Sequence, residues 1–558
     1  MYRQFVATLT RRITLDTRSL AVFRIVAGIL IIADVLLRLR NFTFFYTDNG
    51  AMPVWLAREL THEYAPSIFF LSGSPSVTLL LFGLHLFVGI ALLVGYHTRI
   101  AAVLAFIFVV SLDLRMPLAT SYADILFRLL LFWAMFIPLG ERFSLDALRS
   151  TESPADTYTG LAGAFVLGQM VAMYVANGSH KTPWTDDWLS GHSLYGILHY
   201  DSISWLLGPI LRDIPIIMQI GSVSWFTLMF ISPLLLLLAG RPRYMPAIMY
   251  AGGHLFMAAT VRIGAFPYVA LMGLALFCGP QFWRDARWVA DRAGVLTKLD
   301  ATVISVTERG RVLDARLPRL TVPEPPRAEQ LRYVGTVAVL FLVITAGVFM
   351  IVPTLNTVGA IDDDTAVPLE SEVRSIQSVA KLSQPDWSFY QGPIGSDEYY
   401  VFTAQQADGE VIDVYNDRQT AFDRPHGPHN YKQLDTYRER FYMYSIESRA
   451  NPNFTDGAEV VYADYLCEAH SNGEGDEEIT HLNMWVIEED TNLDSPNDLE
   501  SYDREAVLIH AHACDGGEPQ DIALPPESLT PTLDSETRES IETNDDHRYI
   551  DELSEKEW

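Results

Sequence analysis

The chain of 558 residues is 49% hydrophobic and has a positive mean hydropathy, yet it carries a formal net charge of −28. A single soluble domain does not combine these properties easily, so the composition predicts an apolar membrane part joined to an acidic soluble part. The negative charge argues against nucleic acid as a partner, because phosphate binding needs a basic face.

Nine segments are apolar and long enough to cross a bilayer, whose core takes about 20 residues per helix. They cover residues 20–38, 77–95, 100–118, 122–139, 161–177, 222–239, 244–261, 264–280 and 333–352. Gly208-Pro209 and Pro215 interrupt a further apolar segment, residues 203–220, which we expect to be re-entrant or interfacial. Residues 1–352 are therefore predicted to form an α-helical polytopic membrane bundle.

Basic residues orient this bundle. They precede the first span, occur at Arg99 and Arg241 in two tight turns, and recur through the loop 281–332. With nine spans all of these lie on one side, which the positive-inside rule makes cytoplasmic. We therefore expect a multi-pass protein of the cell membrane, in contact with the lipid bilayer, with its N-terminus inside and its C-terminus outside.

The tail after the last span changes character. Tyr399-Tyr400-Val401-Phe402, Val460-Val461-Tyr462 and Met484-Trp485-Val486-Ile487 cluster aromatic and β-branched residues, which predicts strands. We expect residues 353–525 to form an acidic, mainly β extracellular domain, and the acidic residues 526–558 to be disordered. Acidic residues outnumber basic ones by 68 to 40, a bias typical of a halophilic source.

The chain has three cysteines. Cys467 and Cys514 both lie in the acidic tail, so a disulfide between them is possible if the tail is outside the cell. Cys278 lies in an apolar span and is expected to be inert. His510 and His512 share one face of a predicted strand, but two histidines do not specify a metal, and no zinc spacing occurs. We predict no metal site.

Ionisable residues inside spans are costly and tend to mark function. They include Arg24, Asp34, His85, Asp113, Arg115, Asp124, Arg128 and His254, with Arg262 at the end of the seventh span. The alternative is ion pairing that holds helices in register, as between Asp124 and Arg128, which are one helical turn apart.

A polar stretch follows the span 161–177. Lys181, one of only five lysines, lies there with His180, His192 and His199 among tryptophan and tyrosine residues. A buried amine loses its proton near neutral pH, as a general base must, but aromatic and polar residues also gather at membrane edges as anchors. The topology directs this stretch to the outer side. We expect one outward cavity containing Asp113, Arg115, Lys181, His192, His199 and Arg262.

Three stretches resemble one known family. They are Leu20-Ala21-Val22-Phe23-Arg24, the run from His180-Lys181 to Trp188, Gly191 and Ser193, and the run from His254 to Ile263-Gly264-Ala265-Phe266-Pro267-Tyr268-Val269. They resemble the vitamin K-dependent gamma-carboxylase-like family, and in particular its prokaryotic horizontally transferred transmembrane (HTTM) domain proteins. The resemblance covers residues 15–290.

The resemblance implies a nine-span protein with an outward-facing site, in which Lys181 is the general base that deprotonates a reduced quinone and His254 is a pocket residue. The pocket candidates are His180, His192, His199, His254, Arg24, Asp113, Arg115, Asp124 and Arg262. The implied cofactor is reduced menaquinone or a vitamin K-like quinone. Oxygenation of the quinol gives a strong base that removes a glutamate γ-proton before CO2 adds, so the implied partners are quinone, CO2 and a protein or peptide substrate outside the cell.

The chain departs from the family pattern at two positions. Ala119-Thr120-Ser121-Tyr122 lacks a family histidine, for which Asp124 is the nearest candidate replacement, and Met257 stands where the family has asparagine. A non-catalytic membrane-anchored binding or envelope protein that presents the acidic domain therefore stays open as an alternative. A transporter is disfavoured, because no inverted repeat of broken helices is visible.

Overall fold

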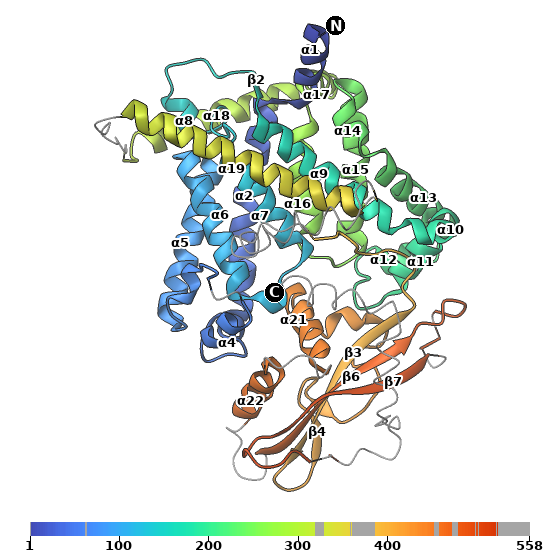
Figure 1. Ribbon diagram of the computed structural model, residues 1–558. Helices are drawn as coiled ribbons and strands as arrows, with labels where there is room; N and C mark the ends of the chain where they lie inside the picture. The colour runs from blue at the N-terminus through green and yellow to red at the C-terminus, as the bar shows by residue number, and fades with distance from the viewer. Residues whose placement is uncertain are drawn as a thin grey trace.

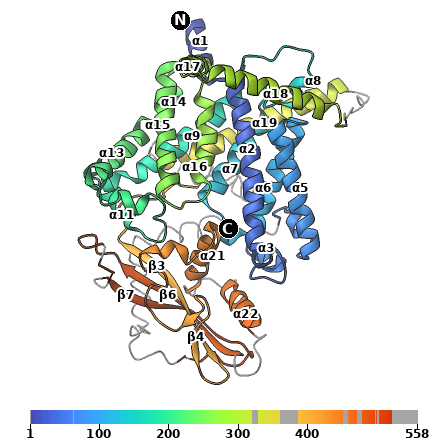
Figure 2. The same ribbon diagram turned by 180° about the vertical axis from the view of Figure 1, so that it is seen from behind.

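The computed structural model describes residues 2–61, 64–318, 328–357, 359, 385–450, 457–470, 478–496, 498–499, 502–520 and 522. Residues 2–318 form a helical bundle, and residues from 385 onward form a separate layer with a β-sheet at one end of it (Figures 1 and 2). The expected tail 526–558 lies outside the described residues.

The longer helices of the bundle run roughly between its two ends. They are α2 (Thr17–Arg38), α5 (Pro75–Val94), α6 (Thr98–Arg115), α7 (Tyr122–Ala134), α9 (Leu161–His180), α13 (Pro215–Ile231), α15 (Arg241–Thr260) and α16 (Phe266–Leu274). Shorter helices are α3 (Phe42–Tyr46), α4 (Val54–Glu59), α8 (Leu145–Arg149), α10 (Thr185–Ser190), α11 (His192–His199), α12 (Gly208–Leu211) and α14 (Leu234–Leu237). The strands β1 (Thr14–Asp16) and β2 (Thr157–Thr159) pair in an antiparallel ribbon.

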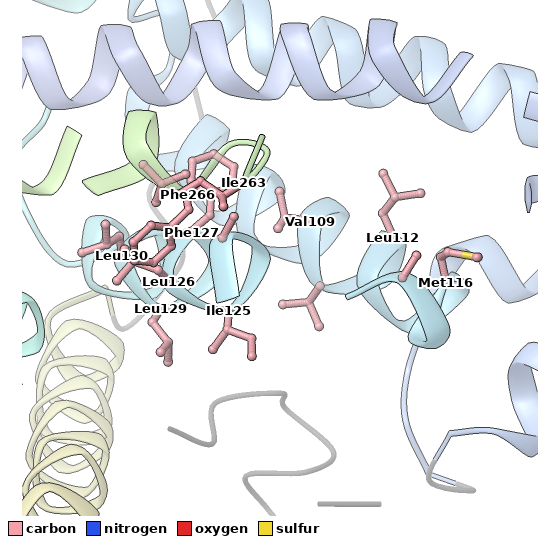
Figure 3. Close-up of a cluster of buried hydrophobic side chains, with 14 of the residues drawn as sticks. Val109, Leu112, Met116, Ile125, Leu126, Phe127, Leu129, Leu130, Ile263 and Phe266 are labelled. Atoms are coloured by element: carbon pink, nitrogen blue, oxygen red, sulfur yellow. The ribbon is translucent and has the colours of Figure 1, made fainter. Parts of the chain in front are cut away.

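Helix α7 lies in the interior of the bundle. Apart from Asp124 and Arg128 its residues are almost all apolar, and residues 125–134 are all buried, which is typical of a helix covered on all sides. It packs against α6, α9 and α16. Figure 3 shows its Leu126, Phe127 and Leu130 beside Phe266 of α16 and near Val109 of α6. This packing fixes the ends of α6, α7 and α16 relative to one another.

By length and composition, three stretches of helix among the described residues can cross a membrane. They are 17–46, 75–94 and 161–180, and they contain the predicted spans 20–38, 77–95 and 161–177 almost entirely. A fourth crossing is possible at the predicted span 264–280, where two helices meet at 103°. The other predicted spans correspond to helices that are shorter or more charged, so helix length alone does not establish nine crossings.

Proline explains where two predicted spans end early. Helix α7 stops at Ala134, ahead of Pro138, and α13 stops at Ile231, just before Pro233. Proline lacks an N–H and clashes with the preceding turn. The expected boundary between a re-entrant segment 203–220 and a span 222–239 is wrong, because α13 already begins at Pro215. Proline is favourable at a first helical position, where its missing N–H costs nothing.

The predicted loop 281–332 contains helices. α17 (Pro280–Arg292) and α18 (Leu296–Asp314) lie at the end of the bundle opposite the sheet, beside α1 (Tyr2–Ile13) (Figures 1 and 2). The predicted last span 333–352 falls within α19 (Ala328–Thr357), which packs against α9. Helix α19 continues to Thr357, so the bundle extends slightly past the predicted boundary at 352.

The C-terminal part is an antiparallel sheet with helices, and the expectation of a mainly β domain needs correction. The strand order is β5-β4-β3-β6-β7, with β3 (Ser396–Gln406), β4 (Val411–Asp413), β5 (Arg418–Gln419), β6 (Ile479–Asp490) and β7 (Asp503–Ala513). Helices α21 (Tyr437–Glu447) and α22 (Ala458–His470) accompany it. The predicted strand at Val460 lies in α22, because Tyr462 of this helix packs against Phe402 of the sheet and Phe44 of the bundle.

A disulfide joins Cys467 of α22 to Cys514, the residue after β7, with a Cα–Cα distance of 5.6 Å. It closes a loop with a sequence separation of 47 residues. On the chain-entropy view, such a cross-link stabilises the fold by about 4 kcal/mol, because it restricts the unfolded chain.

Reduction should therefore lower the melting temperature of the C-terminal part. Tryptophan fluorescence with and without dithiothreitol measures the shift, and Cys514→Ser should reproduce it without reductant. Cys278→Ser is the matched control, because Cys278 is the free cysteine of the bundle and should leave the response to dithiothreitol intact. An identical melting temperature in both redox states would contradict the stabilising role.

Candidate functional site

The segment 385–395, here called the strap, crosses the C-terminal end of α9 before the sheet begins. Four side chains of the polar stretch bind main-chain carbonyls along it. His180 Nε2 lies 3.1 Å from the Asp386 oxygen, and Asn177 Nδ2 donates to Trp387 at 2.7 Å and to Phe389 at 3.0 Å. Trp188 Nε1 donates to the carbonyl of Gln391 at 2.6 Å. The strap is thus bound through its backbone, carbonyl by carbonyl.

Lys181 lies under the middle of the strap and is 1% exposed. Its Nζ donates to the carbonyl of Phe389 at 3.1 Å and to that of Tyr390, and it lies 4.7 Å from the centre of the Trp188 ring. Among the described residues, no carboxylate pairs with this amine. Lys181 follows the last residue of α9, and burial lowers its pKa to about 7. Desolvation is the cause of this shift.

Aromatic rings connect the strap to His254. Phe389 packs edge-on against Phe266 at 5.0 Å between ring centres, and Phe266 lies 5.8 Å from the His254 ring. His254 Nε2 lies 2.8 Å from the hydroxyl of Tyr174. The other ring nitrogen, Nδ1, is buried and has no hydrogen-bond partner. Two of the residues singled out in the sequence, Lys181 and His254, therefore border the same group of rings.

The other members of the expected outward cavity lie in separate surroundings. Arg262 donates to the carbonyls of Leu434 at 2.8 Å and Asp435 at 2.7 Å. His199 Nδ1 lies 2.9 Å from the Tyr195 carbonyl, and the His192 ring packs edge-on against Tyr195. None of these contacts is with Lys181, and the single outward cavity stays a prediction.

The Arg24 side chain binds main-chain carbonyls. Its guanidinium donates to the carbonyls of Leu92 at 2.7 Å, Leu93 at 2.5 Å and Phe143 at 2.5 Å. Leu92 and Leu93 are in the last turn of α5, where carbonyls lack partners within the helix. Arg24 therefore caps α5, at the end of the bundle away from the strap.

Asp34, Arg38, Asp113, Asp124, Arg128 and Arg438 form an ion cluster between the bundle and the C-terminal part. Arg438 of α21 donates to Asp34 at 2.7 Å and to Asp124 at 2.8 Å. The expected pair of Asp124 with Arg128 is wrong, because Arg128 lies 3.4 Å from Asp113 instead. Asp124 is also held by Ser121 in a capping box at the start of α7. It is thus not free to replace the missing family histidine.

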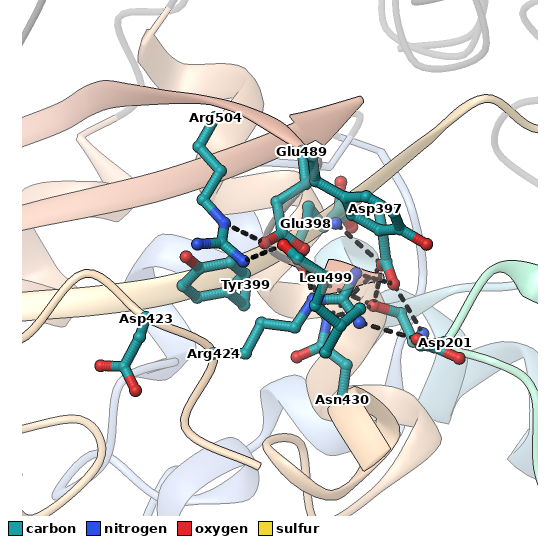
Figure 4. Close-up of polar contacts among 12 residues, drawn as sticks. Asp201, Asp397, Glu398, Tyr399, Asp423, Arg424, Asn430, Glu489, Leu499 and Arg504 are labelled. Carbon is teal, nitrogen blue, oxygen red and sulfur yellow. Dashed lines mark hydrogen bonds and ion pairs between the residues drawn. The ribbon is translucent and has the colours of Figure 1, made fainter. Parts of the chain in front are cut away.

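A second set of charges, here called the clasp, joins the turn after α11 to the sheet (Figure 4). Arg424 binds Asp201 of the bundle at 2.7 Å, Asp397 of β3 at 3.3 Å, and Glu489 of β6. Nε of Arg504 lies 2.5 Å from the second carboxylate oxygen of Glu489. Burial raises the pKa of Asp397 to about 6. All of these carboxylates are at most 3% exposed, and among the described residues Arg424 is the one cation that contacts all three, while Arg212 also pairs with Asp201 at 2.7 Å.

Sequence reasoning missed Asn177, Tyr174, Arg424 and Arg438. The last two have a signal in the sequence only as arginines in an acidic tail, and Asn177 only as the residue at the end of a span. His510 and His512 share a face as expected, with their rings 5.6 Å apart. Among the described residues, no group of three or more possible ligands is arranged to hold a metal ion.

Residues 13–283 match the model of the HTTM domain, a membrane-associated family related to the vitamin K-dependent carboxylase. The match confirms the HTTM part of the resemblance and covers the bundle through the start of α17. No curated protein and no solved structure matches the chain.

Removing the charge of Arg438 tests whether the ion cluster holds the two parts together. Arg438→Met removes one of the two arginines that Asp34 and Asp124 share, the other being Arg38, and we expect a loss of about 2–3 kcal/mol, since the group is partly solvent-screened. Thermal unfolding and limited proteolysis of the full chain measure this loss. Arg309→Met, at an exposed position of α18, is the matched control and should leave the thermal unfolding and the proteolysis pattern unchanged. Equal stability of the two variants would contradict the role.

Proposed function

We propose that this chain is a multi-pass protein of the cell membrane that carries out carboxylase-like, quinol-dependent chemistry at an outward-facing site, with Lys181 as general base. The observation that carries the proposal is the environment of this amine. A neutral amine has two N–H groups and one lone pair. The carbonyls of Phe389 and Tyr390 accept the two N–H bonds, so the lone pair is the part left to accept a proton.

Burial supports the same assignment. A general base works best when its pKa is near the working pH, and desolvation brings the pKa of Lys181 to about 7. The ring of Trp188 and the strap keep the amine away from water, and the described carboxylates are too far to pair with it and hold it charged. Below pH 7 the amine is largely protonated and cannot act as a base.

The residues near His254 fit a reduced quinone in their chemistry. Trp225, Tyr250 and Phe266 offer ring faces for stacking, and the unpaired Nδ1 of His254 offers one hydrogen-bonding atom for a ring oxygen. When bound, reduced menaquinone or a vitamin K-like quinone would supply, with oxygen, the strong base that removes a carbon-bound proton before CO2 adds. Tyr174 would hold the tautomer of His254 through its hydrogen bond to Nε2.

Two features support an external C-terminal part. The arginine-rich helices α17 and α18 and the N-terminal α1 lie together at the far end of the bundle (Figures 1 and 2), as the positive-inside rule requires of a cytoplasmic end. The disulfide at the other end suits an oxidising compartment. We propose nine crossings on these grounds, with a protein or peptide substrate reaching the site from outside.

A non-catalytic function is the second candidate. The strap already satisfies the N–H groups of Lys181, and the clasp ties the sheet to the bundle. A protein that only holds its acidic C-terminal part at the membrane surface needs no more than these contacts.

Substitution of Lys181 separates the two candidates. In full-length protein supplied with reduced menaquinone, Lys181→Ala should lower quinol oxidation by about 100-fold or more, the usual effect of losing a general base. Oxygen uptake and the quinone absorbance measure it. Lys432→Ala, at an exposed lysine of the C-terminal part, should keep full activity. Equal turnover by both variants, or no turnover by the wild type, would favour the non-catalytic function.

The same reaction should depend on pH with a definite sign. Because the folded pKa of Lys181 is about 7 and the neutral amine is the base, the rate should rise as the pH increases from 6 to 8, with a slope of one proton. Initial rates of quinol oxidation across this range provide the profile. A rate that falls over this interval would exclude a lysine base.

Orientation can be tested independently of chemistry. Cysteines introduced as Asp408→Cys, at the exposed turn after β3, and Arg309→Cys, on α18, should differ in their reaction with a membrane-impermeant maleimide. Intact cells should label the first, and only permeabilised cells should label the second. Labelling of Arg309→Cys in intact cells would overturn the proposed topology.

A further inference from the structure

Arg115, the last residue of α6, is a fully buried cation that has no ion-pair or hydrogen-bond partner among the described residues. Its side chain is 0% exposed, and none of its three guanidinium nitrogens meets a hydrogen-bond acceptor there. A guanidinium presents five N–H groups, and leaving them unpaired in the interior costs far more than leaving one neutral group unpaired. The proposed reaction at Lys181 makes no use of this residue.

The acidic residues around the outer end of α6 are already engaged. Asp113, two residues earlier on α6, faces Arg128 at 3.4 Å and Arg38 at 3.9 Å. The other two carboxylates of the ion cluster bind Arg38 and Arg438. Three carboxylates thus face three arginines, and Arg115 is a surplus positive charge in the described part of the chain.

Two other acidic groups act electrostatically on Arg115, namely Tyr46 and Asp48. Neither is a counter-ion for it. Asp48 is exposed, and its Oδ1 accepts the N–H of Val54 at 2.8 Å. The oxygen of Tyr46 accepts a hydrogen bond from Arg38 at 2.9 Å, which leaves the phenolic hydrogen of this buried residue available as a donor.

A second buried polar group without a partner faces α6. Both ring nitrogens of His85 lack a hydrogen-bond partner, and its ring stacks on Phe108 at 5.1 Å. Phe108 precedes Arg115 by seven residues, about two helical turns, so the two lie on one face of α6. Unpaired donors therefore follow this face toward the outer end of the helix.

We propose that Arg115 binds a small monovalent anion, supplied either as chloride or as a small carboxylate such as bicarbonate or acetate. The flat fork of the guanidinium suits a planar carboxylate through two parallel hydrogen bonds, and the phenol of Tyr46 offers one more. Chloride, a spherical ion, would accept hydrogen bonds from the same donors. The anion neutralises the surplus charge and completes the outer end of α6, whatever reaction Lys181 performs.

A titration of the full-length protein in detergent tests the site. Sodium chloride, sodium bicarbonate and sodium acetate are each added at constant sodium and pH, with a bulky buffer sulfonate as the replaced anion. An anion that binds only the folded state raises the melting temperature saturably, and we expect a shift of about 2 °C or more for chloride or for the carboxylates. The anion whose shift in melting temperature saturates at the lower concentration is the one that the site prefers.

Arg115→Met removes the surplus charge and should abolish the saturable shift. In the sulfonate buffer this variant should melt no lower than the wild type, because an unpaired buried charge has been removed. Arg40→Met, at an exposed arginine after α2, is the matched control and should keep the shift. Absence of a saturable shift in the wild type, or an unchanged shift in Arg115→Met, overturns the proposal. The wild-type titration decides this even if Arg115→Met fails to fold.

Discussion

The structure depends on the pairing of charges that are buried between the bundle and the C-terminal part. Asp34, Asp124 and Asp201 belong to the bundle, and each of them pairs with an arginine of the tail, Arg438 or Arg424, as well as with an arginine of the bundle. A carboxylate buried without its partner is strongly destabilising. The C-terminal part is therefore a structural component of the bundle, although only the bundle matches a known family.

This dependence changes how the polar stretch after α9 is understood. The strap is the first described part of the tail after α19 and it contacts the bundle, and the clasp and the ion cluster add further contacts between the two parts. Lys181 keeps its dry environment only while these contacts hold, because the groups that cover it are carbonyls of the strap. The amine and the domain packing are thus one physical system, and stability and reactivity at Lys181 are linked.

Much of the fold was predictable because it depends on local patterns. The long apolar runs of α2, α5 and α9 and the aromatic, β-branched strands β3 and β6 have strong periodic or compositional signals. Helix α22 was mistaken for a strand because its Val460-Val461-Tyr462 favours β structure locally, whereas the disulfide and the packing of Tyr462 favour the helix. Tertiary contacts of this kind leave no local signal.

The candidate site was predictable only in part, for a related reason. Lys181 and His254 could be singled out, because their residue types are rare in apolar surroundings. Their partners could not, since main-chain carbonyls look alike in every sequence. Helical spacing suggested Asp124 with Arg128, but Asp124 binds Arg438, which lies 314 residues away. Proximity in the sequence is a poor guide to ion-pair partners where several oppositely charged residues from distant parts of the chain lie within reach.

The position of Arg438 in the chain also has a consequence for biosynthesis. Asp34 and Arg438 are 404 residues apart, so at ordinary rates of translation the arginine follows its carboxylate by about 20–80 s. During that interval Asp34, Asp113 and Asp124 have only the arginines of the bundle, Arg38 and Arg128, as partners. The ion cluster is therefore complete only after the last third of the chain has been made and has docked.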